Sequence, residues 1–176
     1  MLTADELHEI MPFAHARVEE FCQPLNDAMR EFDISTPLRE AAFIAQVAHE
    51  SGELRYTQEI ADGQAYEGRA DLGNTQPGDG PRFKGRGLLQ ITGRANYLAC
   101  GAALGLDLVS DPGQLTQPVA ACRSAGWFWQ TRGLNELADG SNTLLITRRI
   151  NGGLNGYDDR MRYYRRALAA LGDDQE

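Results

Sequence analysis

Apolar residues recur at helical spacing along most of the chain, with one long interruption. The clearest stretch is STPLREAAFIAQVAHESG, in which Thr36 can cap the helix, Pro37 suits its first turn and Gly52 can end it. A shorter helix is predicted in TADELHEIM, where Thr3 precedes Glu6 at the capping-box spacing. The same periodicity predicts helices over about 14–31, 93–104, 117–131, 142–150 and 157–171. The chain is therefore predicted to be mainly α-helical.

The interruption runs from 63 to 87 and reads GQAYEGRADLGNTQPGDGPRFKGRG. It contains seven glycines and two prolines and little helical periodicity, which predicts a long Gly-rich loop or a short hairpin. Ordered loops of this length often carry function. Because the chain has no internal repeat, low-complexity linker or evident boundary, we predict a single domain over 1–176.

Composition and charge narrow the functional classes. Hydrophobic residues make up 42% and charged residues 24%, which is typical of a globular protein, and the net charge of −8 argues against a nucleic-acid binder. Cys22, Cys100 and Cys122 form no C-x-x-C pair, so we expect free thiols, most of them buried. No apolar run approaches the roughly 18–20 residues of a membrane span, and the N-terminus lacks the features of a secretory signal. We therefore expect a cytoplasmic protein that does not insert into a membrane.

Two carboxylates are candidates for acid–base chemistry. On a helix, Phe43, Val47 and Glu50 share one stripe, which places Glu50 at the end of the apolar face. A carboxyl group there loses hydration, which disfavours its charged form and suits a general acid; a structural pair with an arginine fits the same position. Glu59 lies nine residues later, beyond the expected helix end, and can face Glu50 across a cleft. Two carboxyl groups flanking a sugar bond are the basic equipment of a glycosidase.

Metal and phosphate chemistry are not indicated. His49-Glu50 would need a histidine at position 53 for a zinc motif, and Glu53 stands there. GPRFKGRG has spaced glycines but Arg86 at the lysine position of a phosphate-binding loop. We expect neither a metal nor a cofactor.

Five motifs, taken in their order along the chain, indicate a function more specifically than the pair of carboxylates does. AHESGELRYTQE, FKGRGLLQITGRANY, AGWFW, RRINGG and DDRMRYYRR together resemble glycoside hydrolase family 19, which contains chitinases and phage-type endolysins. The resemblance covers about 37–166 and implies one catalytic domain with a lysozyme-like fold, in which two helical lobes flank a central substrate cleft. It implies that Glu50 is the general acid, that Glu59 is the general base and that Thr92 helps to hold the attacking water. The family inverts at the anomeric carbon, so the two carboxyl groups are expected about 6.5–9.5 Å apart.

The resemblance also implies substrate-binding residues. Gln90 and Asn96 match positions that contact the substrate, Asn151 matches a residue that binds sugar, and Arg160 matches an arginine that orients the catalytic base. Without the resemblance, Asn151 fits a helix end and Arg160 fits a solvated surface charge. Trp127, in AGWFW, has two aromatic neighbours, and we expect most of this aromatic run in the core.

Two features leave the assignment of these roles open. Glu53 replaces a glycine that is common in the family, and is either an exposed bystander or a local tuner of the acid–base pair. The Gly-rich segment supplies the rival carboxylates Glu67, Asp71 and Asp79, any of which could take the place of Glu59.

The functional hypothesis is a monomeric endolysin that cuts the β-1,4 bond between N-acetylmuramic acid and N-acetylglucosamine in peptidoglycan. Its release would depend on a separate membrane-permeabilising protein. The first alternative keeps the chemistry and takes chitin as substrate. The second is a glycan-binding module without activity, against which the retained Glu50, Glu59 and Thr92 argue.

Overall fold

The computed structural model describes residues 1–172, and most of them are helical. The predicted domain runs to 176, so residues 173–176 of that prediction lie outside the described part. The longer helices match the predicted ranges closely and are α1 (Ala4–Ile10), α2 (Arg17–Glu31), α3 (Pro37–Glu50), α5 (Arg94–Leu104), α6 (Pro118–Thr131), α8 (Thr143–Asn151) and α9 (Tyr157–Ala170).

Local capping chemistry starts two of these helices where the sequence predicts. Thr3 accepts a hydrogen bond from the backbone N–H of Glu6 at 3.2 Å, and the Glu6 carboxylate accepts the backbone N–H of Thr3 at 2.6 Å. Thr36 accepts the backbone N–H of Arg39 at 3.3 Å at the start of α3. Each bond satisfies an N–H that the first turn of a helix leaves without a partner. The start of α3, whose last residue is Glu50, is thus fixed by its own sequence.

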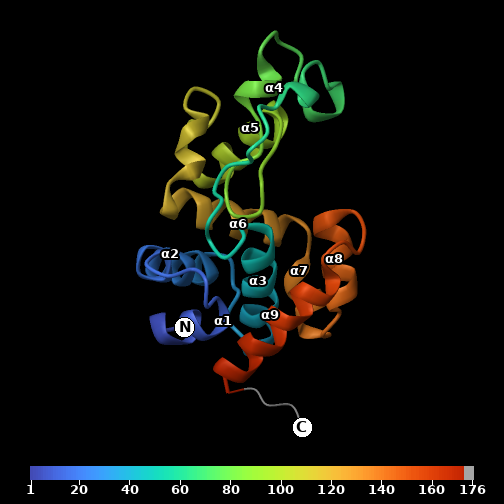
Figure 1. The fold of residues 1–176 in the computed structure, drawn as a ribbon. Coiled ribbons are helices and arrows are strands. Elements are labelled where there is room, and N and C mark those ends of the chain that lie inside the picture. The colour runs from blue at the N-terminus through green and yellow to red at the C-terminus, as the bar shows by residue number, and fades with distance from the viewer. Residues whose placement is uncertain (173–176) are drawn as a thin grey trace.

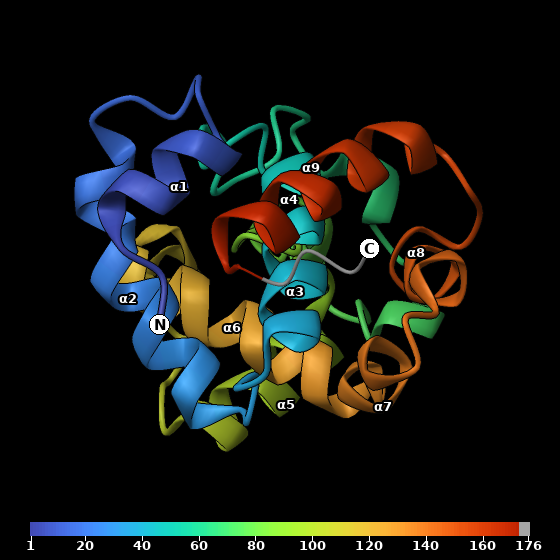
Figure 2. The same cartoon turned by 90° about the horizontal axis from the view of Figure 1, so that it is seen from below.

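The helices form two lobes joined through α6 (Figure 1). The helical lobe contains α1, α2, α3, α8 and α9, with α3 at its centre (Figure 2). Its core includes an edge-to-face pair of Phe43 and Trp129, whose ring centroids lie 5.4 Å apart. The smaller loop lobe contains α5 and the Gly-rich segment, where Phe83 and Tyr97 pack at 5.2 Å. A two-lobed helical architecture was the predicted fold.

The Gly-rich segment contains more structure than predicted. It folds into the short helices η1 (Gln64–Tyr66), η2 (Ala70–Leu72) and α4 (Asp79–Arg82), which are too short to leave a periodic signal. The predicted hairpin is reduced to isolated bridges of Arg86 with Gln58 and with Ile91. Two further short helices, η3 (Pro112–Thr116) and α7 (Leu134–Asp139), were not predicted either.

The cysteines are free thiols. Cys100 and Cys122 are buried and Cys22 is partly buried. Burial raises the pKa of the Cys100 thiol to about 12, so it stays protonated and unreactive at neutral pH. Over residues 1–172, none of the helices combines the length and apolar character needed to cross a membrane.

Candidate active site

Glu50 is the last residue of α3 and is held by a buried arginine. Its Oε1 accepts a hydrogen bond from Nη2 of Arg160 at 2.6 Å, while its side chain stays 23% exposed. No hydrogen bond from any described residue reaches Oε2 of Glu50. Of the two possibilities that the sequence left open for Glu50, a dehydrated carboxyl group or a pair with an arginine, the structure shows the arginine pair. One oxygen is thereby fixed and the other is available to a ligand.

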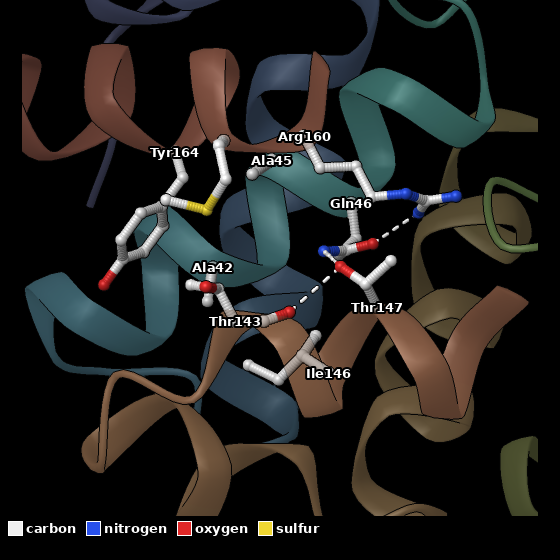
Figure 3. Close-up of a pocket in the computed structure, with 9 residues that line it drawn as sticks. Ala42, Ala45, Gln46, Thr143, Ile146, Thr147, Arg160 and Tyr164 are labelled. Carbon is white, nitrogen blue, oxygen red and sulfur yellow. Dashed lines mark hydrogen bonds between the residues drawn. The ribbon is translucent and has the colours of Figure 1, made fainter. Parts of the chain in front are cut away.

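Arg160 lies behind Glu50 rather than at the surface. It is 1% exposed, and its other N–H groups donate to Oε1 of Gln46 at 2.5 Å and to the carbonyl of Asn155 at 3.3 Å. Figure 3 shows Arg160 reaching from α9 to Gln46 on α3, with Thr147 of α8 next to that amide. The carboxylate that Arg160 contacts is that of Glu50, and so little of the guanidinium is exposed that it offers scant surface to a sugar. Its predicted roles in binding substrate and in orienting the base stay predictions.

His49, the neighbour of Glu50, has a structural partner. Its Nδ1 lies 2.7 Å from Oδ2 of Asp159, and its ring packs over Gly156, where an added Cβ would lie 2.2 Å from Cε1. These contacts tie the loop between α8 and α9 to the end of α3. Within the described chain, no cluster of histidine, cysteine and carboxylate side chains could hold a metal ion.

Glu59 lies in the loop lobe, and its two carboxylate oxygens differ. Its backbone N–H donates to the carbonyl of Gly85 at 2.9 Å, which anchors the residue against the end of the Gly-rich segment. Oε2 accepts a hydrogen bond from the hydroxyl of Tyr66 in η1 at 3.0 Å. Oε1 is buried and has no hydrogen-bond partner among residues 1–172. A buried acceptor without a donor lowers the stability of the fold, because its lost hydration is not replaced by a hydrogen bond. Such atoms in native proteins therefore call for an explanation.

Gly85 lets Gln90 approach Glu59. A Cβ at position 85 would lie 2.3 Å from Oε1 of Gln90 and 3.0 Å from Oε2 of Glu59. Gln90 has a left-handed backbone, with φ at +53°, and its side-chain amide donates to the carbonyl of Gly87 at 3.1 Å. The candidate base and a predicted substrate contact therefore both lie close to the position that a Cβ would occupy on Gly85.

A groove continues from Gln90 along the loop lobe to α6. We call this surface the groove; its lining residues are Gln90, Ile91, Thr92, Asn96, Trp127, Phe128 and Arg132. The side-chain amide of Asn96 donates to the carbonyl of Thr92 at 2.7 Å. Three predicted residues, Gln90, Thr92 and Asn96, are thus brought together. Asn151 is exposed and ends α8 on the helical lobe.

The rival carboxylates are engaged in holding the Gly-rich segment. Glu67 accepts the backbone N–H groups of Gly78 at 2.7 Å and Gly80 at 2.8 Å. Asp79 is 1% exposed and pairs with Arg94. Asp71 is exposed and pairs with its loop neighbour Arg69. Each has a structural role, whereas one oxygen of Glu59 has no partner in the described part of the chain.

Comparison with known proteins decides the family. The family described as chitinase class I, glycoside hydrolase family 19, matches residues 31–144. The chain belongs to glycoside hydrolase family 19. A family 19 domain-containing protein of Haemophilus influenzae is 31% identical over 194 residues, which cover 92% of this chain and 94% of that protein. An endochitinase of Arabidopsis thaliana is 42% identical over 114 residues, which cover 64% of this chain and 39% of that protein.

The fold of this family 19 protein is that of chitinase C from Streptomyces griseus. The two superpose with a TM-score of 0.80 at 22% identity, covering 97% of this chain and 76% of the chitinase. The predicted family and the mainly helical, lysozyme-like fold are confirmed, and the chain is a chitinase-like glycoside hydrolase. It spans less than half of the Arabidopsis endochitinase, so that protein's activity is not carried over as established.

Glu53 is one of the places where this family 19 chain departs from the expected pattern. It is 5% exposed, so it is not an exposed bystander. Its carboxylate accepts the backbone N–H of Phe13 at 2.6 Å and the hydroxyl of Tyr163 at 2.7 Å. Burial, together with the Glu53 carboxylate, raises the pKa of Tyr163 to about 12, so this hydroxyl remains a donor at neutral pH. Both oxygens of Glu53 are thus used in joining the N-terminal segment to α9.

Sequence reasoning missed three residues of this hydrolase site. Gln46 precedes Glu50 by one helical turn, and that spacing is a signal which could have found it. Tyr66 lies in a segment without periodicity, and Arg132 follows a helix, so no local pattern pointed to either.

The Gly85 contact leads to a testable prediction for the family 19 site. Gly85 has no positive φ, so Gly85→Ala adds only a methyl group. The nearest atom is the mobile end of Gln90, which can move aside without unfolding the chain, and Glu59 is displaced with it. We expect kcat/KM on a chitin oligomer to fall about tenfold, because a misplacement of catalytic groups by about an ångström strongly lowers the catalytic rate.

The matched control is Gly140→Ala. Gly140 also has a negative φ, and the nearest atoms to its added Cβ lie at an ordinary 3.8 Å. Both variants should unfold near the wild-type temperature. Unchanged activity in Gly85→Ala would contradict the close approach of Gln90 and Glu59.

Proposed function

We propose that this protein hydrolyses the β-1,4 bond of a polymer of N-acetylated amino sugars by an inverting acid–base mechanism. The observation that carries the proposal is the buried Oε1 of Glu59, which has no hydrogen-bond partner within residues 1–172. Tyr66 orients the carboxylate through Oε2, which leaves Oε1 as an acceptor for a donor from outside the chain. An inverting hydrolase needs such an acceptor for the proton of its attacking water.

Glu50 supplies the acid in this mechanism. Arg160 holds Oε1, so the proton that goes to the leaving oxygen is carried on Oε2. As water attacks the anomeric carbon, its proton passes to Glu59 while Glu50 protonates the departing sugar oxygen. Thr92 lies in the groove beside Gln90, and its hydroxyl is suited to orient the water. Gln90 and Asn96 provide amides for sugar hydroxyl and acetamide groups.

Chitin-type polymers are the first substrate candidate. The Arabidopsis protein, which is 42% identical over its matched region, is named an endochitinase, and this supports cleavage between N-acetylglucosamine units. Peptidoglycan is the second candidate. It shares the β-1,4 amino-sugar backbone and adds carboxylates, and the groove contains a cation, Arg132, without a carboxylate partner in the described chain.

Product analysis tests the proposal. Chitin hexaose and purified peptidoglycan are digested separately, and the anomer formed first is followed by proton NMR. Inversion of a β bond yields the α-anomer first. An initial β-anomer would refute the inverting mechanism, and the absence of new reducing ends from both polymers would favour a non-catalytic glycan-binding module. Mass spectrometry of peptidoglycan products identifies the sugar at the new reducing end.

A further inference from the structure

Arg132 is a half-buried cation in the wall of the groove. It follows the last residue of α6, and its guanidinium carbon lies 3.4 Å from the centroid of the Phe128 ring. The one hydrogen bond that its guanidinium makes within the described chain is a long one, 3.5 Å, from Nη1 to the carbonyl of Phe128. Stacking on the ring orients the guanidinium, while most of its five N–H donors have no acceptor among residues 1–172.

The charge of Arg132 is not neutralised locally. Residues 1–172 provide it with no ion pair, whereas Arg94 pairs with Asp79 and Arg160 pairs with Glu50. Burial lowers the pKa of Arg132, which reflects the hydration that the side chain has lost. An arginine nevertheless keeps its charge at neutral pH.

The surroundings of Arg132 add positive charge on a chain whose net charge is −8. Arg149 donates from Nη1 to the backbone carbonyl of Arg132 at 2.7 Å. The carboxylate of Glu136 lies near Arg149: its Oε2 and Nη1 of Arg149 are each 3.5 Å from the position a Cβ would take on Gly133. The groove face of Arg132 is left to a ligand.

We propose that Arg132 determines specificity by binding a carboxylate on the substrate. The other polar groups of the groove, Gln90, Thr92 and Asn96, are uncharged and suit sugar hydroxyls and acetamides. A guanidinium held flat on an aromatic ring suits the planar, bidentate acceptor that a carboxylate presents. Chitin has no such group. A glycan with free carboxylates has one, either on a peptide attached to the sugar or on a free lactyl ether.

The proposal rests on the hydrolase function proposed above and is tested by rate comparison. The substrates are chitin hexaose, intact peptidoglycan, peptidoglycan with its carboxylates converted to amides, and glycan strands stripped of their peptides. We expect Arg132→Gln to lower kcat/KM on intact peptidoglycan roughly tenfold, the effect of losing one charge-assisted hydrogen bond, and to leave chitin hexaose unchanged. Arg132→Lys keeps the positive charge but not the planar guanidinium. Its loss of kcat/KM on intact peptidoglycan should therefore be smaller than that of Arg132→Gln.

Arg165→Gln is the matched control, because Arg165 is an exposed arginine on α9 outside the groove. It should leave all four rates unchanged. Amidation should lower the wild-type rate to that of Arg132→Gln and have no effect on the variant. Stripped strands distinguish the sources: dependence on Arg132 that survives there identifies the lactyl carboxylate, and dependence that disappears identifies the peptide.

Four results separate failure of this proposal from failure of the function. Equal losses for Arg132→Gln on chitin and peptidoglycan would show that the residue supports packing and overturn its role in specificity. A wild type indifferent to amidation, or one that cleaves chitin and not peptidoglycan, would also overturn that role while leaving the hydrolase intact. A wild type that cleaves none of the four substrates would overturn the proposed function itself.

Discussion

Glu59→Gln is expected to lower kcat on chitin oligomers by roughly a hundredfold to ten-thousandfold, the range for loss of a general base. The amide keeps an acceptor for the Tyr66 hydroxyl, so the side chain stays in place, but it cannot take a proton from water. KM should therefore change little. Asp71→Asn is the matched control, since Asp71 is an exposed carboxylate of the Gly-rich segment, and its kcat should stay within about twofold of wild type.

Chemical rescue distinguishes the role of Glu59 as the base from that of Glu50 as the acid. Azide is a nucleophile that needs no base, so it should restore turnover to Glu59→Ala and give the α-glycosyl azide, formed by attack opposite to the departing oxygen. Glu50→Gln should lose as much activity on natural oligomers and gain nothing from azide. Its activity should recover on an oligomer with a nitrophenyl leaving group, which departs without protonation. The reverse pattern would exchange the two roles, and a full loss in Asp71→Asn would move the base into the Gly-rich segment.

The long helices and the position of Glu50 could be predicted because their determinants are local. Thr36 caps α3 through a bond that spans three residues, and the apolar stripe of α3 runs along one helix. The partner of Glu50 could not be predicted in the same way. Arg160 lies 110 residues away, and the guanidinium meets the carboxylate only once α9 packs against α3. From sequence alone, an arginine in DDRMRYYRR is equally a surface charge.

The loop lobe was harder to predict for a related reason. Its short helices are stabilised by side-chain bonds to backbone groups, such as Glu67 to Gly78 and Gly80, rather than by a repeating apolar face. The Tyr66 hydroxyl reaches Glu59 only after these bonds have shaped the segment. Motif resemblance could point to Glu59, but it could not show that one of its oxygens is held and the other is left without a donor.

Glu53 has an unfavourable backbone conformation, but its side chain makes favourable hydrogen bonds. It lies in a run of left-handed residues, with φ of +57° at Gly52, +58° at Glu53 and +64° at Leu54. A side chain in this region costs about 1–2 kcal/mol relative to glycine. Glu53 offsets that cost by accepting hydrogen bonds from the backbone N–H of Phe13, in a partly buried position, and from the buried hydroxyl of Tyr163. The carboxylate therefore fixes the chain as it leaves Glu50, at the junction of the N-terminal segment, α3 and α9.

We expect Glu53→Ala to lower the free energy of unfolding by about 2–5 kcal/mol, because it leaves two donors unsatisfied while keeping the strained φ. Glu53→Gly loses the same bonds but relieves the backbone, so it should be about 1 kcal/mol more stable than Glu53→Ala. Tyr163→Phe removes only one of the bonds and should lie between Glu53→Ala and wild type. Urea unfolding measures all three.

Activity distinguishes this structural role from tuning of the acid–base pair. Both oxygens of Glu53 are used by Phe13 and Tyr163, so kcat of Glu53→Ala should stay within about threefold of wild type where the protein is folded. The pH dependence of kcat should keep its shape, because Glu50 and Glu59 retain Arg160 and Tyr66 as their neighbours. A variant of wild-type stability with a displaced pH profile would identify Glu53 as a tuner of the catalytic pair. The two hydrogen bonds predict the opposite result: a marked loss of stability and an unshifted profile.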